Sequence, residues 1–159
     1  MAELRGLAEE LGWRDVQSYI QSGNLVFGAS AAAGKAEALL EEAIQRRFGL
    51  SIPIVIRSAS QWTALAASNP FPEAAAKEPN RVMLLLSKQA PSRDSAEALQ
   101  ENARNGERIT AAGGALWIHY PDGAGTSKLS PALIDRLAGS STTARNYRTV
   151  TKLDEMLRA

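Results

Sequence analysis

The chain has 159 residues, of which 45% are hydrophobic and 22% are charged, as in an ordinary folded protein, so wholesale disorder is excluded. Lys and Arg number 18 against 17 Asp and Glu, and the resulting net charge of +1 gives no general attraction to nucleic acid or to an acidic membrane. With 0 Cys and 1 His, the sequence excludes disulfides, thiolate metal sites, cysteine catalysis and any site that needs two imidazoles.

The first half of the sequence predicts a helix, a β-hairpin, a second helix, a strand and a short helix. Apolar residues at helical spacing, each series followed by a glycine, mark the two longer helices. Two apolar runs around a Ser-Gly-Asn turn favour the hairpin, and a β-branched run favours the strand. In chain order, the predicted ranges are 3–11, 16–20 with 25–27, a helix that follows the connection 29–34 and runs to about 48, then 52–56 and from 58 onward.

The second half predicts a strand, a helix, a hairpin, a helix, a short strand and a closing helix. Its first strand, residues 81–86, is a continuous apolar run, which is typical of a strand covered on both faces. Serines in N-cap positions mark the starts of the first two helices, and Gly139 marks the end of the second. The other ranges are 92–103, 107–111 with 115–120, 130–139, 142–147 and from 150 onward.

The order of these elements predicts an α+β fold with two ferredoxin-like βαββαβ repeats and largely antiparallel sheets. The first repeat lacks only its first strand. We expect a single domain over residues 1–159 made of two halves, about 1–72 and about 80–159. A run of alanines, charges and Pro79 predicts the junction at residues 73–79.

Three stretches of polar and aromatic residues keep a fixed order through nearly the whole chain, at Tyr19–Phe27, Tyr120–Leu129 and Thr143–Val150. Together they resemble an uncharacterised bacterial family, the domain-of-unknown-function 1697 family. The resemblance implies a compact α+β protein of two ferredoxin-like repeats. It brings no established activity, cofactor or catalytic residue.

The beginning of the chain departs from the family pattern. Family members usually start with a strand and a glycine-containing turn, whereas here Met1 leads almost directly into the first predicted helix. The first strand of a βαββαβ unit lies inside the sheet. Its absence would therefore leave the neighbouring strands with unpaired N–H and C=O groups.

The first candidate site is a glycine-containing loop with one cation. Backbone N–H groups of such a loop, a Lys and the start of the following helix can hold a phosphate or carboxylate. The alternative, which we favour, is a connector that needs glycine for tight turns. The residues concerned are Tyr120, Asp122, Gly123, Gly125, Ser127 and Lys128.

The second candidate is Arg145 with Asn146, followed by an aromatic residue and two more cations. Such a group can grip the phosphate of a nucleotide. The favoured alternative is a solvated helix start, with Asn146 or Thr149 as its cap and Arg145 in a surface ion pair.

The third candidate is the polar hairpin tip with Tyr19, Gln21, Ser22 and Asn24. Its amides and hydroxyls can bind a ligand. Turn chemistry is again the favoured alternative, with Gly23 at positive φ and Asn24 or Ser22 bonded to its own backbone. It leaves Gln21 unexplained.

We favour the hypothesis of a cytoplasmic binding module for a small anionic ligand, such as a nucleotide, held near Lys128 and Arg145. One alternative is an enzyme that acts on a phosphorylated or carboxylate metabolite, with His119 or Asp122 as the acid–base group. The other is a protein-interaction module with an open sheet edge, which also predicts self-association.

Other partners and cofactors are constrained more weakly. No metal site is expected, because one His without thiolates leaves only scattered carboxylates. No motif identifies a cofactor. Nucleic acid is disfavoured by the charge balance, and a membrane partner is not expected because no apolar run approaches about 20 residues.

Overall fold

A continuous apolar run forms the centre of a four-stranded sheet. In the computed structural model, which describes residues 1–21 and 23–159, this run is paired antiparallel on both sides. In the order in which they lie across the sheet, the strands are β4 (Arg108–Ala112), β5 (Ala115–His119), β3 (Val82–Leu86) and β6 (Thr143–Asn146). The second predicted hairpin is confirmed as β4 and β5.

Two helices complete the βαββαβ pattern around this sheet. α5 (Arg93–Glu101) follows β3, and α6 (Pro131–Ala138) follows β5. The serines predicted as N-caps act as such: Ser92 accepts a hydrogen bond from the Ser95 N–H and Ser130 one from the Leu133 N–H. The strand order β4-β5-β3-β6, with β3 inside, is that of the ferredoxin-like unit predicted for this half.

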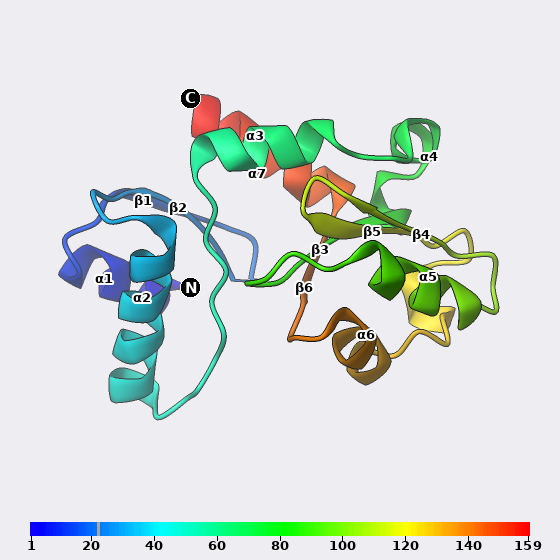
Figure 1. Ribbon diagram of the computed structural model, residues 1–159. Helices are drawn as coiled ribbons and strands as arrows, with labels where there is room; N and C mark the ends of the chain where they lie inside the picture. The colour runs from blue at the N-terminus through cyan, green and yellow to red at the C-terminus, as the bar shows by residue number, and fades with distance from the viewer. Residues whose placement is uncertain (22) are drawn as a thin grey trace. The chain divides into compact units, whose positions relative to one another are not determined.

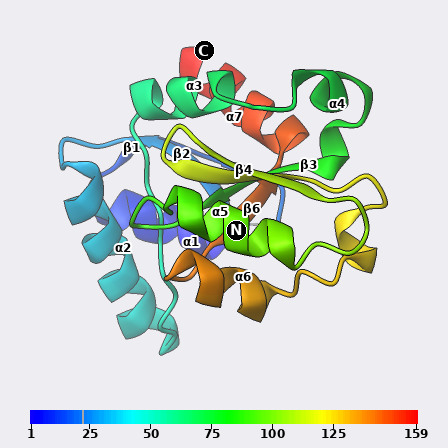
Figure 2. The ribbon, with the colours of Figure 1, turned by 45° about the vertical axis from the view of Figure 1, so that its right-hand side comes forward.

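Helices cover both faces of the four-stranded sheet (Figures 1 and 2). Since alternate strand residues face opposite sides, Leu85 packs with Leu116 and Ile118 in a core shared with α5 and α6. The other face carries Leu84 and Trp117, and lies toward three further helices. These are α3 (Ala59–Ala67), α4 (Pro72–Lys77), which leads into η1 (Pro79–Arg81), and α7 (Tyr147–Arg158).

Contacts divide the chain into a first unit of residues 1–58 and 155–159, and a second unit of residues 59–154. α3 therefore belongs to the second unit, where the Trp62 indole donates to the Val150 carbonyl at 3.1 Å. The boundary lies between residues 58 and 59. Residues 73–79, where the sequence predicts the junction, lie within α4 and η1.

The first unit has two helices on a two-stranded sheet. Its elements are α1 (Ala2–Glu10), β1 (Arg14–Tyr19), β2 (Asn24–Gly28) and α2 (Ala33–Phe48). Its core is built on Leu7, Leu40 and Ile44 from the helices, with Trp13 stacked on Phe27 at 4.1 Å between ring centroids. The predicted first helix, first hairpin and second helix are thus confirmed.

The prediction of a strand over residues 52–56 is wrong. No ladder includes these residues, although Ile54 and Ile56 pack against the same core as Leu25 and Phe27. β-branched residues favour a strand only if a neighbouring strand takes up their backbone groups. In the second unit, the last strand of the repeat, β6, pairs only with the first strand, β3. The described residues of the first unit contain no counterpart of that strand.

The fold is α+β, with antiparallel sheets, as the sequence predicts. No helix in the described ranges has both the length and the apolar character needed to cross a membrane.

Candidate functional site

Tyr120 lies in the core of the second unit, not on the surface of a loop. Its ring packs with the apolar side chains between the sheet and α5 and α6, and only 5% of the residue is exposed. Burial, with a smaller effect of the Glu107 carboxylate, raises the pKa of Tyr120 to about 12. Its burial among apolar side chains therefore gives Tyr120 a packing role.

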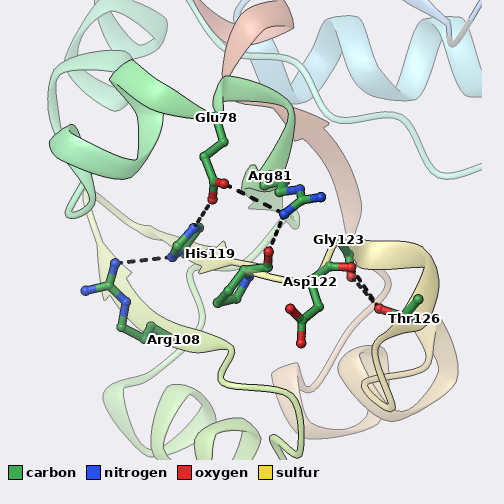
Figure 3. A network of polar contacts seen from close by, with 8 residues as sticks. Glu78, Arg81, Arg108, His119, Asp122, Gly123 and Thr126 are labelled. Carbon is green, nitrogen blue, oxygen red and sulfur yellow. Dashed lines mark hydrogen bonds and ion pairs between the residues drawn. The ribbon is translucent and has the colours of Figure 1, made fainter.

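The loop that follows Tyr120 is organised by its own backbone. Gly123 has a φ of 85°, which favours glycine, and the Thr126 hydroxyl donates to the carbonyls of Asp122 and Gly123 at 2.9 and 3.3 Å (Figure 3). The Ser127 hydroxyl accepts the Leu129 N–H at 3.1 Å. Turn chemistry thus accounts for these predicted residues.

Three other members of the loop offer their groups to solvent. Asp122, Gly125 and Lys128 are all exposed. Lys128 makes no ion pair with any residue that the structure describes.

Arg145 and Asn146 are held by contacts with β6 and with the start of α7. The Arg145 guanidinium donates to the Thr143 hydroxyl at 2.9 Å and to the Ala144 carbonyl at 2.8 Å, and burial lowers the pKa of Arg145. The Asn146 side chain accepts the Thr149 N–H at 3.0 Å, so it caps the helix as the favoured alternative expected.

Tyr120 and Arg145 lie on opposite faces of the four-stranded sheet. Arg145 pairs with Leu84 in the ladder and so lies on the Trp117 face of the sheet. Tyr120 belongs to the core on the opposite face. A single cradle lined by both side chains is therefore not formed.

The hairpin tip shows the turn chemistry that the sequence predicts. Gly23 has a φ of 84°, and the Asn24 amide donates to the Tyr19 carbonyl at 3.1 Å across the turn. Asn24 is buried, whereas Gln21 is exposed. Ser22, the remaining predicted residue of this group, lies outside the described residues.

His119 is the centre of a polar network at one end of the sheet (Figure 3). Its Nε2 lies 2.9 Å from a carboxylate oxygen of Glu78, and its Nδ1 lies 3.2 Å from the Arg108 guanidinium. Arg108 also stands over the Phe71 ring, 4.9 Å from its centroid. Asp122, which the sequence offered beside His119 as an acid–base group, is not among these partners.

The network fixes the histidine tautomer. A guanidinium can only donate, so Nδ1 of His119 accepts from Arg108, and Nε2 carries the proton that it donates to Glu78. This hydrogen bond, followed by the charges of Arg81 and Lys77, lowers the pKa of Glu78 against the opposing effect of burial. Nδ1, the atom that would accept a proton from a substrate, already accepts the hydrogen bond from Arg108. We therefore infer that His119 has a structural role and links Glu78 to Arg108, and that it does not act as a general base.

Glu78 and Arg108 were missed by the analysis of the sequence. Glu78 is 41 positions from His119 along the chain. Arg108 lies directly opposite His119 in the antiparallel pair of β4 and β5. The predicted hairpin could have revealed Arg108, but only the tertiary fold brings Glu78 to this place.

Residues 51–57 of the first unit are extended in sequence pattern but pair with no strand in the described ranges. This segment runs back alongside α2 (Figures 1 and 2). Side chains of α2 take up its backbone donors: Glu41 accepts the Ile54 N–H at 2.9 Å and Glu37 accepts the Ile56 N–H at 2.8 Å. The Arg57 guanidinium donates to the Ile56 carbonyl at 3.0 Å and lies 3.8 Å from Glu37.

The large apolar side chains that are exposed in the described residues all belong to the first unit. They are Ile20 at the hairpin tip, Phe48 at the end of α2, and Leu50 and Ile52, which follow α2. A metal site has no support, because the described ranges contain no group of three or more candidate ligands.

The comparison with family models matches residues 1–117 to the family described as "Protein of unknown function (DUF1697)". The chain belongs to this family. The resemblance noted from the sequence is thereby confirmed. The fold of this DUF1697 protein is similar to that of the conserved bacterial protein SP0830 from Streptococcus pneumoniae, with a TM-score of 0.75 and 22% identity. The match covers 99% of this chain and 88% of that chain. This likeness shows the fold alone, and no curated protein matches the DUF1697 chain.

Proposed function

We propose that this DUF1697 protein is a protein-interaction module whose first unit pairs with an extended strand between β2 and residues 51–57. The observation that carries the proposal is a difference in strand order between the two units. In the second unit β3 lies between β5 and β6. Among the described residues, the first unit has counterparts of both neighbours, β2 and residues 51–57, but no strand that pairs with either of them at that place.

The order of elements supports this correspondence. The first unit runs α1, β1, β2, α2, residues 51–57, and α3 follows. The second runs α5, β4, β5, α6, β6 and α7. β1 pairs antiparallel with β2 as β4 does with β5. The position that corresponds to β3 thus lies between β2 and residues 51–57, where an added strand would find partners on both sides.

The core of the first unit also supports an added strand. β5 is buried along its whole length, whereas Leu25 and Phe27 of β2 and Ile54 and Ile56 are only half-buried. Complete burial of such a side chain stabilises by roughly 1.5–3 kcal/mol relative to full exposure. An added strand could therefore bury these four side chains further and stabilise the first unit.

The proposal is tested by supplying the strand in cis. A copy of residues 81–88, which contains β3, is joined ahead of Met1 through a flexible glycine–serine linker, so that its effective concentration is about millimolar. We expect the amides of β2 and of residues 51–57 to exchange hydrogen at least tenfold more slowly and the melting temperature to rise.

The matched control carries proline in the tether in place of the copy of Leu84. Proline has no N–H and is excluded from the middle of a sheet. If the tether with proline protects the same amides equally well, or if neither tether protects them, the first unit does not accept a strand. If the untethered chain is a dimer by light scattering and its β2 amides become exposed on dilution, the occupant is a second copy, and the proposal of a separate partner fails.

A small anionic ligand at the loop 121–130 is a second candidate. It is favoured by the exposed, unpaired ammonium group of Lys128 among the described residues. We expect inorganic phosphate or a nucleoside triphosphate to raise the melting temperature of the native chain and of Lys35→Glu, an exposed lysine of α2, but not of Lys128→Glu. Equal shifts in all three proteins would exclude this site.

A further inference from the structure

We propose that Asn105 is a site of spontaneous covalent modification, at which the side-chain amide is lost and an aspartate or isoaspartate forms. Asn105 lies in the connection between α5 and β4 and is followed directly by Gly106. It is the only asparagine of the sequence that precedes a glycine. The inference is independent of the proposed function, because it concerns the second unit and requires no added strand.

The reaction joins the backbone nitrogen of Gly106 to the side-chain carbonyl carbon of Asn105. As this C–N bond closes a cyclic imide, the bond from that carbon to the side-chain nitrogen breaks, and the proton of the Gly106 N–H leaves with this nitrogen as ammonia. Water then adds to one of the imide carbonyls. Opening at the side-chain carbonyl gives aspartate, and opening at the backbone carbonyl gives isoaspartate, in which the chain continues through the former side chain. Asparagine is thermolabile in proteins for this reason.

The attacking nitrogen of Gly106 is free in this fold. The buried carboxylate of Glu107 accepts the N–H groups of Arg104 at 3.2 Å and of Asn105 at 3.0 Å. The next N–H along the chain, that of Gly106, has no hydrogen-bond partner among the described residues, and Gly106 is exposed. A bonded N–H must give up its partner before its nitrogen can attack. At Gly106 this cost does not arise.

The side chain of Asn105 is also within reach of this nitrogen. The reacting atoms must approach to about 3–3.5 Å, and a glycine adds no side chain that would hinder this approach. The amide nitrogen of Asn105 donates to the Thr126 carbonyl at 2.8 Å, in an exposed place. The restraint on the leaving group is therefore a single bond at the surface, as far as the described residues show.

The loop after Tyr120 offers a comparison within the same molecule. Asp122 is the only aspartate of the sequence that precedes a glycine, and such a pair can close the same imide with loss of water. There, however, the Gly123 N–H donates to the Tyr120 carbonyl at 3.0 Å, so the attacking nitrogen is held by the turn. The sequence alone marks both pairs, whereas the hydrogen bonds favour reaction at Asn105.

Modification loosens a connection between two loops. The Asn105 amide joins the chain before β4 to the loop that follows Tyr120. A carboxylate has no N–H, so the product loses this donor and places a negative charge against the Thr126 carbonyl. Isoaspartate also lengthens the backbone beside the buried carboxylate of Glu107, which holds the Asn105 N–H.

The test compares each residue with itself in the folded and the unfolded chain. The full chain is incubated at mildly alkaline pH, with and without urea, and its peptides are analysed by mass spectrometry and by an isoaspartate-specific methyltransferase. Amide loss at Asn105 adds about 1 Da. Both signals should appear at Asn105 in the native protein, and folding should slow Asp122 about tenfold more than Asn105, since only Gly123 must give up a hydrogen bond. If Asn105 stays intact in the native protein, or if folding protects it as strongly as Asp122, the proposal fails.

Asn105→Gln is the matched control. It keeps an amide that can donate, but closing an imide then requires a larger ring. This variant should release no ammonia under the same conditions, and ammonia release at the native rate would place the reaction elsewhere and overturn the proposal. Asn105→Asp, which has the structure of one product, should melt about 2–4 °C below the native chain. An unchanged melting temperature would show that the bond to the Thr126 carbonyl does not hold the loops together, and would refute the structural consequence.

Discussion

Replacing Tyr120 by Phe is expected to protect the fold against alkali. The pKa of Tyr120 is raised from 10.0 to about 12, first by burial and then by Glu107. A group whose pKa is higher in the folded state contributes stability below its unfolded pKa and loses it as the pH rises through the folded pKa. The relevant window is therefore from pH 10 to about 12. The difference of about 2 pH units corresponds to about 2.7 kcal/mol.

The assay is urea unfolding of native protein and Tyr120→Phe at neutral pH, at pH 10 and near pH 12, with Tyr147→Phe as a control for the loss of a hydroxyl. We expect the free energy of unfolding of Tyr120→Phe, relative to the native chain, to improve by about 2–3 kcal/mol across this window. A constant difference between the two proteins would show that the Tyr120 hydroxyl meets solvent. The packing role assigned to it would then be wrong, and a ligand role would regain support.

Two further predictions concern the β4–β5 turn and the His119 network. A Cβ at Gly113 would lie 2.5 Å from Oγ of Ser68, whereas one at Gly114 meets nothing within 4 Å, and both have positive φ. Gly113→Ala should therefore lower the free energy of unfolding by about 1–3 kcal/mol more than Gly114→Ala in urea titrations, and equal losses would refute the close contact. Because the pKa of Glu78 is lowered, its carboxylate stabilises the fold above pH 4.5, and this contribution is lost at lower pH. Glu78→Gln should flatten the fall in melting temperature on acidification, as should His119→Phe, and an unchanged acid profile in both would contradict the structural role of His119.

Much of the fold could be predicted because its signals are local. The serine caps of α5 and α6 and the paired glycines of the second hairpin each act within a few residues, and all were read correctly. Alternation in β5 also assigned Ile118 and Trp117 to opposite faces.

The candidate site depended on contacts that no local pattern encodes. Tyr120 and Lys128 occur in one motif, yet one side chain is buried in the core and the other is exposed. Tyr120 and Arg145, which belong to the first and second candidate sites, lie on opposite faces of the sheet. The Glu78 carboxylate reached His119 only through the path of the chain between α4 and β3.

The sequence by itself determined the positions of both hairpins and of the longer helices, because propensity, capping and periodicity operate over one or two turns of chain. The short helix α4, which lies where the sequence predicts a junction, was not among them. Whether residues 52–56 become a strand was decided by tertiary structure alone. A β-branched run needs a neighbour to take its N–H and C=O groups. In the first unit those groups are met by Glu37, Glu41 and Arg57, which the fold brings to the edge from α2 and from the segment itself.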